Sequence, residues 1–107
     1  MSVGRPLKPQ YFHILLALAS RELHGYGIQR AVLDRTEGQI RLWPAMLYRS
    51  LGKLEGAELI RGVPAPEGEP EDERRQYYQI TARGLERLRE EAATLARWAR
   101  AAEQAGG

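Results

Sequence analysis

The sequence predicts one mainly α-helical domain with a small β-hairpin. Three observations lead to this fold class. Apolar residues recur at helical spacing in three short segments, two extended segments flank a loop near residue 70, and a heptad repeat runs through the C-terminal part of the chain. The 107 residues suffice for one domain, and a composition of 43% hydrophobic and 28% charged residues is typical of globular proteins.

The three short helices are expected at residues 9–19, 24–38 and 44–56. A proline starts the first and the third, at the helix position where a missing N–H group costs nothing. The first helix is apolar on two faces, so we expect one face in the core of this domain and the other against a partner chain. Residues 40–42 are too few for more than a small strand or an extended link.

Residues 59–63 and 75–80 are expected to pair as a β-hairpin around a loop rich in Pro, Gly and Glu. Thr81 is a good N-cap for a last helix over residues 82–104. The apolar residues of this helix are three or four positions apart, which is the spacing of a heptad seam between two helices. They are Leu85, Leu88, Ala92, Leu95, Ala99 and Ala102. We expect this seam to be exposed in a single chain and covered by a second copy; the alternative is that the helix folds back over its own core.

Three helices followed by a hairpin is the plan of a winged helix-turn-helix, in which the second helix of the pair enters the major groove of DNA. The predicted fold is therefore a winged helix-turn-helix plus a long C-terminal dimerisation helix. We assign residues 1–81 to a winged-helix DNA-binding domain and residues 82–107 to the dimerisation helix, both within one compact unit.

The helix over residues 44–56 is the predicted recognition helix. Its core stripe is Leu47, Leu51 and Leu54. On the opposite stripe, Arg49 and Lys53 are four residues apart and share a face, from which they can reach phosphates or guanine edges. The alternative is an ordinary solvated helix face. The full stripe consists of Ala45, Met46, Arg49, Ser50 and Lys53.

Arg74 and Arg75 lie at the return of the hairpin, beside Tyr77, where a wing places cations along the phosphate backbone. In the alternative interpretation they balance an acidic loop, because residues 62–75 hold two Arg and five Asp or Glu. Residues 1–61 hold nine Lys or Arg against five Asp or Glu, which is a mild electrostatic footprint for phosphate.

Other classes of function have little support. The chain has no cysteine, which excludes disulfides, zinc fingers and thiol catalysis. His13 and His24 have no partner at the spacing of a metal pair, so we expect His13 to be structural and His24 to start a helix. Without a nucleophile elbow or a phosphate-binding glycine loop, we expect no enzyme, no cofactor and no metal. No apolar run spans a bilayer and no secretory signal is evident, which predicts a cytoplasmic protein with no membrane partner.

Several short motifs occur in order between residues 9 and 100. They are Ile14-Leu15-Leu16-Ala17-Leu18-Ala19, His24-Gly25-Tyr26-Gly27, Pro44-Ala45-Met46-Leu47-Tyr48, Leu51, Leu54, Leu59-Ile60, and Arg74-Arg75-Gln76-Tyr77-Tyr78-Gln79-Ile80-Thr81 with Gly84. In these motifs the chain resembles the PadR family of transcriptional regulators, in its short form with a single C-terminal helix.

The resemblance implies a homodimeric repressor that binds roughly palindromic promoter DNA through the third helix and the wing. Several members of the family are released from DNA by small aromatic ligands. Carried over by residue, the resemblance implies that Tyr48, Lys53, Arg75 and Tyr77 contact DNA.

A second function stays open, namely a protein-interaction or ligand-sensing module with weak or no DNA binding. Trp43, Met46 and the acidic wing favour it.

A small aromatic effector is the remaining expected partner, besides double-stranded DNA and a second copy of the chain. Trp98 precedes the seam residue Ala99 and has alanines around it, so a planar ligand could stack on its indole between two such helices. The resemblance, in contrast, puts Leu95 at the position where relatives carry the ligand-binding tryptophan. The alternative is that Trp98 packs on the first helix of the partner.

Overall fold

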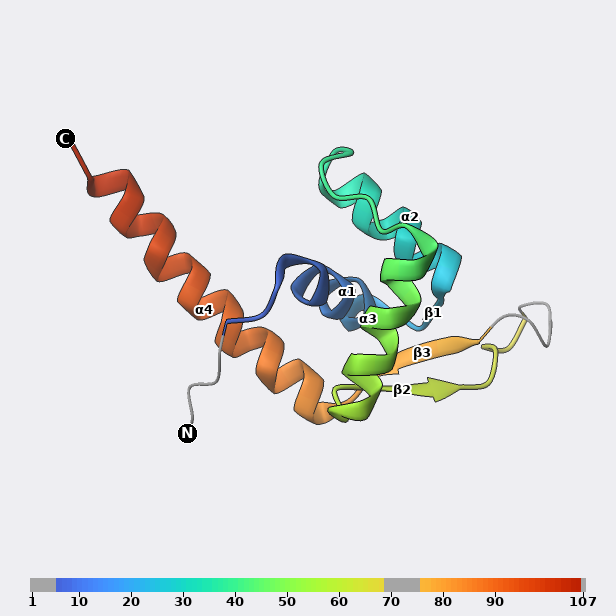
Figure 1. The fold of residues 1–107 in the computed structure, drawn as a ribbon. Coiled ribbons are helices and arrows are strands. Elements are labelled where there is room, and N and C mark those ends of the chain that lie inside the picture. Colours follow the sequence, from blue (N-terminus) through green and yellow to red (C-terminus); the bar gives the residue numbers. More distant parts are fainter. Residues whose placement is uncertain (1–5, 69–75, 107) are drawn as a thin grey trace.

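The computed structural model describes residues 6–68 and 76–106 (Figure 1). The elements in chain order are α1 (Pro9–Ser20), β1 (Leu23–His24), α2 (Gly25–Arg35), α3 (Pro44–Gly56), β2 (Ile60–Val63), β3 (Tyr77–Ile80) and α4 (Ala82–Gln104). This order confirms the predicted fold class, a mainly α-helical winged helix-turn-helix followed by one long helix.

The helices begin where the sequence predicts. Prolines open α1 and α3. His24 caps α2, because its Nδ1 atom accepts a hydrogen bond from the Gly27 N–H at 3.1 Å. Thr81 caps α4 in the same way, its hydroxyl oxygen accepting from the Gly84 N–H at 2.9 Å. The predicted role of His24 as a helix-start residue is confirmed.

The hairpin carries a third strand that the sequence did not predict. The strand order is β1-β3-β2, and both pairs are antiparallel. Leu23 pairs with Tyr78 and His24 with Tyr77, while Arg61 of β2 pairs with Gln79. A strand of two residues shows no alternation, and its partner lies far along the chain, so only the folded molecule reveals it.

α1 lies at the centre of the domain and contacts α2, α3, α4 and β3. Residues from both of its apolar stripes are buried within this one chain, whereas Tyr11, Phe12 and Leu16 are only partly buried. The core that forms around α1 includes Ile14, Leu15, Leu18, Ile28, Val32, Leu42, Leu47, Leu51, Leu54, Ile60, Tyr78 and Leu88.

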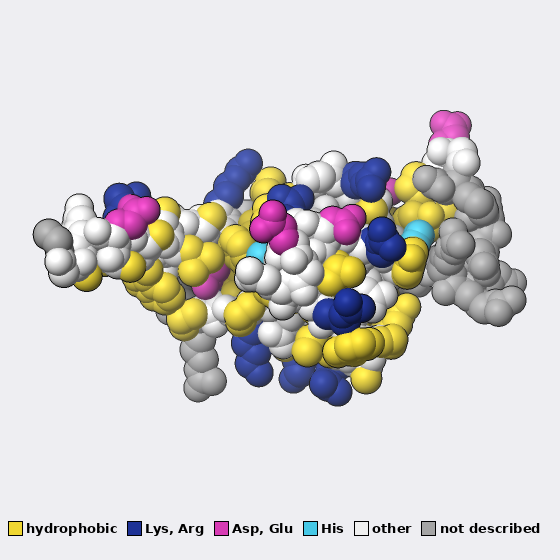
Figure 2. Space-filling view, turned by 90° about the horizontal axis from the view of Figure 1, so that it is seen from above, with side chains coloured by type: hydrophobic (Ala, Val, Ile, Leu, Met, Phe, Trp, Pro, Cys, Tyr) yellow, Lys and Arg dark blue, Asp and Glu magenta, His cyan; other side chains and the backbone are white. Residues whose placement is uncertain are grey.

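α4 extends away from this core. Its 23 residues span roughly 34 Å at the usual helical rise. The first half of α4 packs against α1, and the second half projects beyond every other element (Figure 1). Figure 2 shows hydrophobic side chains along one side of this projecting arm. Neither α4 nor any other helix in the described part of the chain is long and apolar enough to cross a membrane.

Candidate nucleic-acid interface

α3 has one buried and one exposed face. Leu47 and Leu51 are buried in the core, which confirms the predicted core stripe. Tyr48, Arg49 and Lys53 lie on the opposite face, where all three are exposed. The tyrosine ring is 57% exposed, which is unusual for so large an aromatic side chain. The helix therefore presents a phenol and two cations to solvent.

Two residues expected on this exposed stripe belong to the buried face instead. Ser50 is buried and Met46 is partly buried against the core. The reason is helical spacing, because Ser50 follows Leu47 by three positions and precedes Leu54 by four, so it shares their side of the helix. The exposed residues of α3 include Ala45, Tyr48, Arg49, Gly52 and Lys53, and Glu55 is exposed near its C-terminal end.

Tyr48 is held against the start of α2. A Cβ atom added to Gly25 would lie only 2.7 Å from the Tyr48 hydroxyl oxygen, so the tyrosine packs directly over the glycine. Gly25 is buried by this contact while much of the Tyr48 ring remains exposed. The contact fixes the hydroxyl group at the junction of α2 and α3.

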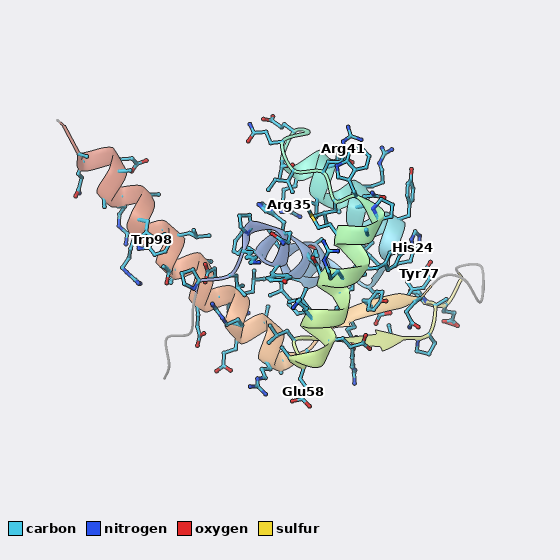
Figure 3. All side chains as sticks on the ribbon, viewed as in Figure 1. His24, Arg35, Arg41, Glu58, Tyr77 and Trp98 are labelled. Atoms are coloured by element: carbon cyan, nitrogen blue, oxygen red, sulfur yellow. The ribbon has the colours of Figure 1, made fainter. Side chains whose placement is uncertain are left out.

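Aromatic rings gather where β1 meets α2. The His24 ring stacks on Tyr26 with centroids 6.4 Å apart. It also packs edge-to-face with the Tyr77 ring, with centroids 5.1 Å apart (Figure 3). Tyr26 is exposed, whereas Tyr77 is buried. His24 therefore ties the N-terminal end of α2 to the wing, in addition to capping the helix.

The burial of Tyr77 differs from its expected place on the wing surface. Strand alternation puts Tyr77 and Tyr78 on opposite faces of the sheet, but both faces are covered at this point and both side chains are buried. We therefore leave the Tyr77 side chain out of the candidate interface. The expected wing residues Arg74 and Arg75 lie outside the described residues.

Arg61 of β2 is an exposed wing cation that the sequence did not single out. Its Nε and Nη2 atoms donate to the Gln79 side-chain oxygen at 2.8 and 2.6 Å. The Gln79 amide nitrogen in turn donates to the Glu22 carboxylate at 2.9 Å. This row of side chains runs from β2 across β3 to Glu22, which precedes β1, and holds the guanidinium in place. The only signal in the sequence is an arginine at a strand position that faces outward.

The wing is also joined to α3 through Tyr78. Burial raises the pKa of the Tyr78 hydroxyl, and the nearby Glu55 carboxylate and Tyr48 raise it further. The Tyr78 hydroxyl therefore stays neutral over the physiological range. Contacts between α3 and β2 hold this helix and the hairpin together.

The residues of the predicted dimerisation seam are divided between two environments. Leu88 is only 6% exposed and belongs to the core of this chain, and Leu85 is partly buried against that core. The expectation that the whole seam is exposed in a single chain is therefore wrong for these two leucines. They pack inward because the first half of α4 contacts α1. One helical turn after Leu88, Glu91 is also buried and forms an ion pair with Arg87 at 3.0 Å.

Beyond Glu91 the same helix is open to solvent. Leu95 is 38% exposed and Trp98 is 52% exposed, and Ala92 and Ala99 are exposed beside them. Figure 3 shows Trp98 on the projecting half of α4, away from the globular part of the molecule. An apolar face of this kind is a common feature of surfaces that bind a partner.

The fold and the α3 surface together define a winged-helix protein. Residues 14–90 match the PadR-like family of transcriptional regulators. The chain therefore belongs to the PadR-like family, as its motifs indicated. This family consists of transcription regulators and not of enzymes.

Most of this chain also matches one uncharacterized protein. The chain is 37% identical over 84 residues to an uncharacterized 37.1 kDa protein in transposon TN4556 of Streptomyces fradiae. That match covers 78% of this chain but 22% of the relative, so this chain spans about a fifth of the relative's length.

Two solved structures share the fold. The first is a PadR family transcription regulator from Clostridium difficile, with a TM-score of 0.77 and 22% identity over 94% of this chain and 100% of that one. The second is Bacillus subtilis PadR in complex with operator DNA, with a TM-score of 0.64 and 22% identity over 78% of this chain and 46% of that one.

Proposed function

We propose that this protein is a sequence-specific DNA-binding repressor that acts as a homodimer on a roughly palindromic promoter site. The observation that carries the proposal is the exposed face of α3, with Tyr48 beside the two cations Arg49 and Lys53. A helix of this size fits the major groove of duplex DNA. Bacillus subtilis PadR, which shares the fold, was solved with operator DNA bound. We further propose that the protein acts in the cytoplasm.

In this proposal each exposed side chain has a distinct role. Both Arg49 and Lys53 carry only hydrogen-bond donors. They donate to phosphate oxygens or to the O6 and N7 atoms of guanine. The Tyr48 hydroxyl, fixed against Gly25, contacts the DNA backbone. Arg61 supports the wing contact, to which Arg74 and Arg75 contribute further positive charge.

The second half of α4 is the proposed dimerisation surface. Leu95 and Trp98 expose apolar area on a helix that projects from the domain, and a second copy would cover it. Ala92 and Ala99 are small enough to let the two helices approach closely. In such a dimer the two α3 helices would lie about 34 Å apart, so that each enters the major groove one helical turn from the other.

We also propose that a planar aromatic ligand binds between the subunits at Trp98 and Leu95. Offset stacking on an indole contributes about 0.5–1.5 kcal/mol beyond burial. A ligand wedged there changes the angle between the subunits and hence the spacing of the two α3 helices. Ligand binding and DNA binding are then coupled, because both depend on the same dimer geometry.

The DNA-binding part is tested by incubating the protein with a random-sequence duplex library and sequencing the bound fraction. The proposal predicts enrichment of two inverted half-sites about one helical turn apart. The double variant Arg49→Ala, Lys53→Ala should enrich this site much less, because it binds the site more weakly. The control variant Arg83→Ala, Arg89→Ala, which removes two exposed cations from α4 instead, should enrich the same site. If the wild-type protein enriches no sequence, the alternative of an interaction or ligand-sensing module replaces this proposal.

The effector part is tested in the Trp43→Phe variant, in which Trp98 is the only indole. A panel of planar aromatic compounds is titrated while fluorescence and DNA affinity are followed together. Quenching accompanied by a loss of DNA affinity supports the switch. Quenching at constant DNA affinity means that the site does not regulate binding, and no quenching at sub-millimolar concentration means that there is no site.

A further inference from the structure

The link between α2 and α3 ends on an exposed tryptophan. Leu42 is fully buried, but its neighbour Trp43 is 60% exposed. Trp43 has extended backbone angles, with φ −68° and ψ 151°, as expected for the residue before a proline. Successive side chains of an extended segment point in opposite directions, so burying Leu42 turns the Trp43 indole outward at the point where α3 begins.

This link is fixed at several points. The Gln29 side chain of α2 donates a hydrogen bond to the Leu42 carbonyl oxygen. The Ile40 N–H donates to the Thr36 hydroxyl at 3.0 Å, which anchors the other end of the link to the end of α2. The backbone that carries Trp43 is therefore rigid, and only two side-chain torsions remain to position the indole.

A cation covers one face of the indole. The central guanidinium carbon of Arg41 lies 5.2 Å from the centroid of the Trp43 ring, within the range of a cation–π contact. The two residues are two positions apart, and this contact places them on the same side of the link. Within residues 6–68 and 76–106, no carboxylate forms an ion pair with Arg41. Its charge is thus available to a partner.

The pair carries hydrogen-bond donors and no acceptor. The indole Nε1–H and the guanidinium N–H groups can only donate, so the matching partner is a group that only accepts. A phosphodiester is such a group, and half or more of all protein–DNA hydrogen bonds go to phosphate and sugar. Figure 3 shows Arg41 and Glu58 at opposite ends of α3, with the cation at the end where the helix begins.

We propose that Arg41 and Trp43 form a phosphate-binding pair that contacts the DNA backbone at the edge of the groove entered by α3. The indole donates to one phosphate and the guanidinium to the same or the next one. The cation–π contact keeps the two groups side by side. This inference rests on the proposed DNA binding and extends it to two residues outside α3 and the wing. A base contact by the same indole is a different outcome, which the experiment separates.

The experiment uses the wild-type protein and a duplex that it selects from the random library. Single phosphates along this duplex are replaced, one at a time, by uncharged methylphosphonate. The inference predicts one or two positions at which the replacement weakens wild-type binding about ten-fold. At these positions the Arg41→Gln variant, already about ten-fold weaker on the normal duplex, should lose nothing more. The Trp43→Phe variant, which removes the N–H donor and keeps a smaller aromatic ring beside Arg41, should show a reduced loss of affinity at the same positions.

Arg83→Gln serves as the matched control, because it removes one exposed cation beside Glu58, at the opposite end of α3. In this control, each methylphosphonate replacement should weaken binding as much as it does for the wild type. Circular dichroism is used to check that the variants are folded. We expect them to be folded because the replaced side chains are exposed. If Arg41→Gln and Trp43→Phe bind every duplex as the wild type does, the pair has no role. The remaining outcome is that Trp43 variants bind thymine and uracil duplexes equally well, unlike the wild type, but are still weakened by methylphosphonate. In that case the indole contacts a base, and the phosphate assignment is wrong.

Failure of this inference is distinct from failure of DNA binding itself. A wild-type protein that selects no duplex overturns both. A wild-type protein that selects a duplex through Arg49 and Lys53, but ignores Arg41 and Trp43, overturns the phosphate pair alone.

Discussion

Replacing Gly84 with alanine tests how closely α4 packs against the start of the wing. Gly84 is buried in the first turn of α4. An added Cβ atom would lie 2.0 Å from the Leu59 carbonyl oxygen and 2.8 Å from Cγ1 of Ile80. Real Cβ contacts are essentially never under 3.0 Å, so the start of α4 must move by about 1 Å. The Leu59 oxygen also accepts a hydrogen bond from the Thr81 N–H at 3.0 Å, which this movement strains.

The expected cost follows from these contacts. Overpacking a tight site costs about 1–3 kcal/mol, and this case lies at the upper end because the contacted atom belongs to the backbone. Weakening the Thr81 hydrogen bond adds about 1 kcal/mol. A total of about 4 kcal/mol lowers the melting temperature of a domain of this size by about 16 °C. Thermal unfolding followed by circular dichroism, at one fixed protein concentration, measures the shift.

Gly52→Ala is the matched control. Gly52 lies inside α3 on its exposed face, and an added Cβ would meet nothing within 4 Å. Alanine is favoured over glycine in a helix by roughly 0.5–1 kcal/mol, so this variant should melt at or slightly above the wild-type temperature. If Gly84→Ala melts at the same temperature as Gly52→Ala, the close approach of α4 to Leu59 is refuted.

Three further predictions follow from buried or capping residues. Leu88→Glu should unfold the chain, because it puts a charge in the core. Leu95→Glu should leave the chain folded, and light scattering should show a monomer. A folded Leu88→Glu protein would contradict this prediction. Burial, with the nearby Arg35 charge, lowers the pKa of His13, so the unfolded state binds its proton more readily and stability should fall as the pH drops below about 6.5. His13→Gln should flatten that part of the stability curve, and an unchanged curve would rule out the effect. Thr81→Ala removes the N-cap of α4 and should lower the free energy of unfolding, measured in urea, by about 1 kcal/mol. An unchanged free energy of unfolding would mean that the cap does not stabilise the helix.

The helices could be predicted from the sequence because their ends depend on local chemistry. A proline at the first helical position and a threonine that caps the next N–H groups act within four residues of the chain. The same holds for the core stripe of α3, whose spacing is set by the helix itself. The cationic face of Arg49 and Lys53 could be predicted for that reason.

Features that depend on distant contacts could not be predicted in the same way. The strand β1 exists only because Leu23 and His24 pair with β3. Alternation puts Tyr77 and Tyr78 on opposite faces of the sheet, but it does not show that the His24 ring covers one of them. Ser50 is a polar residue, which favours an exposed position, although its spacing of three residues from Leu47 indicates the buried face of α3.

The heptad spacing of α4 shows the limit most clearly. Leu88 and Leu95 are equivalent by spacing, yet one is buried in this chain and the other exposed. The repeat indicates an apolar face and does not say which molecule covers it. Only the position of α1 beside the first half of α4 decides the difference.

The salt dependence of DNA binding tests the central claim, that α3 contacts the phosphate backbone, most directly. Each phosphate neutralised by a cation contributes about 0.9 to the slope of log K against log salt concentration. Binding of the selected duplex is measured over a salt series for the wild type and for the Arg49→Ala, Lys53→Ala double variant. If both side chains contact phosphates, the slope flattens by about two units in the double variant, and the charge-matched Arg83→Ala, Arg89→Ala variant keeps the wild-type slope. An unchanged slope with full affinity in the α3 double variant would contradict the claim and remove α3 from the interface.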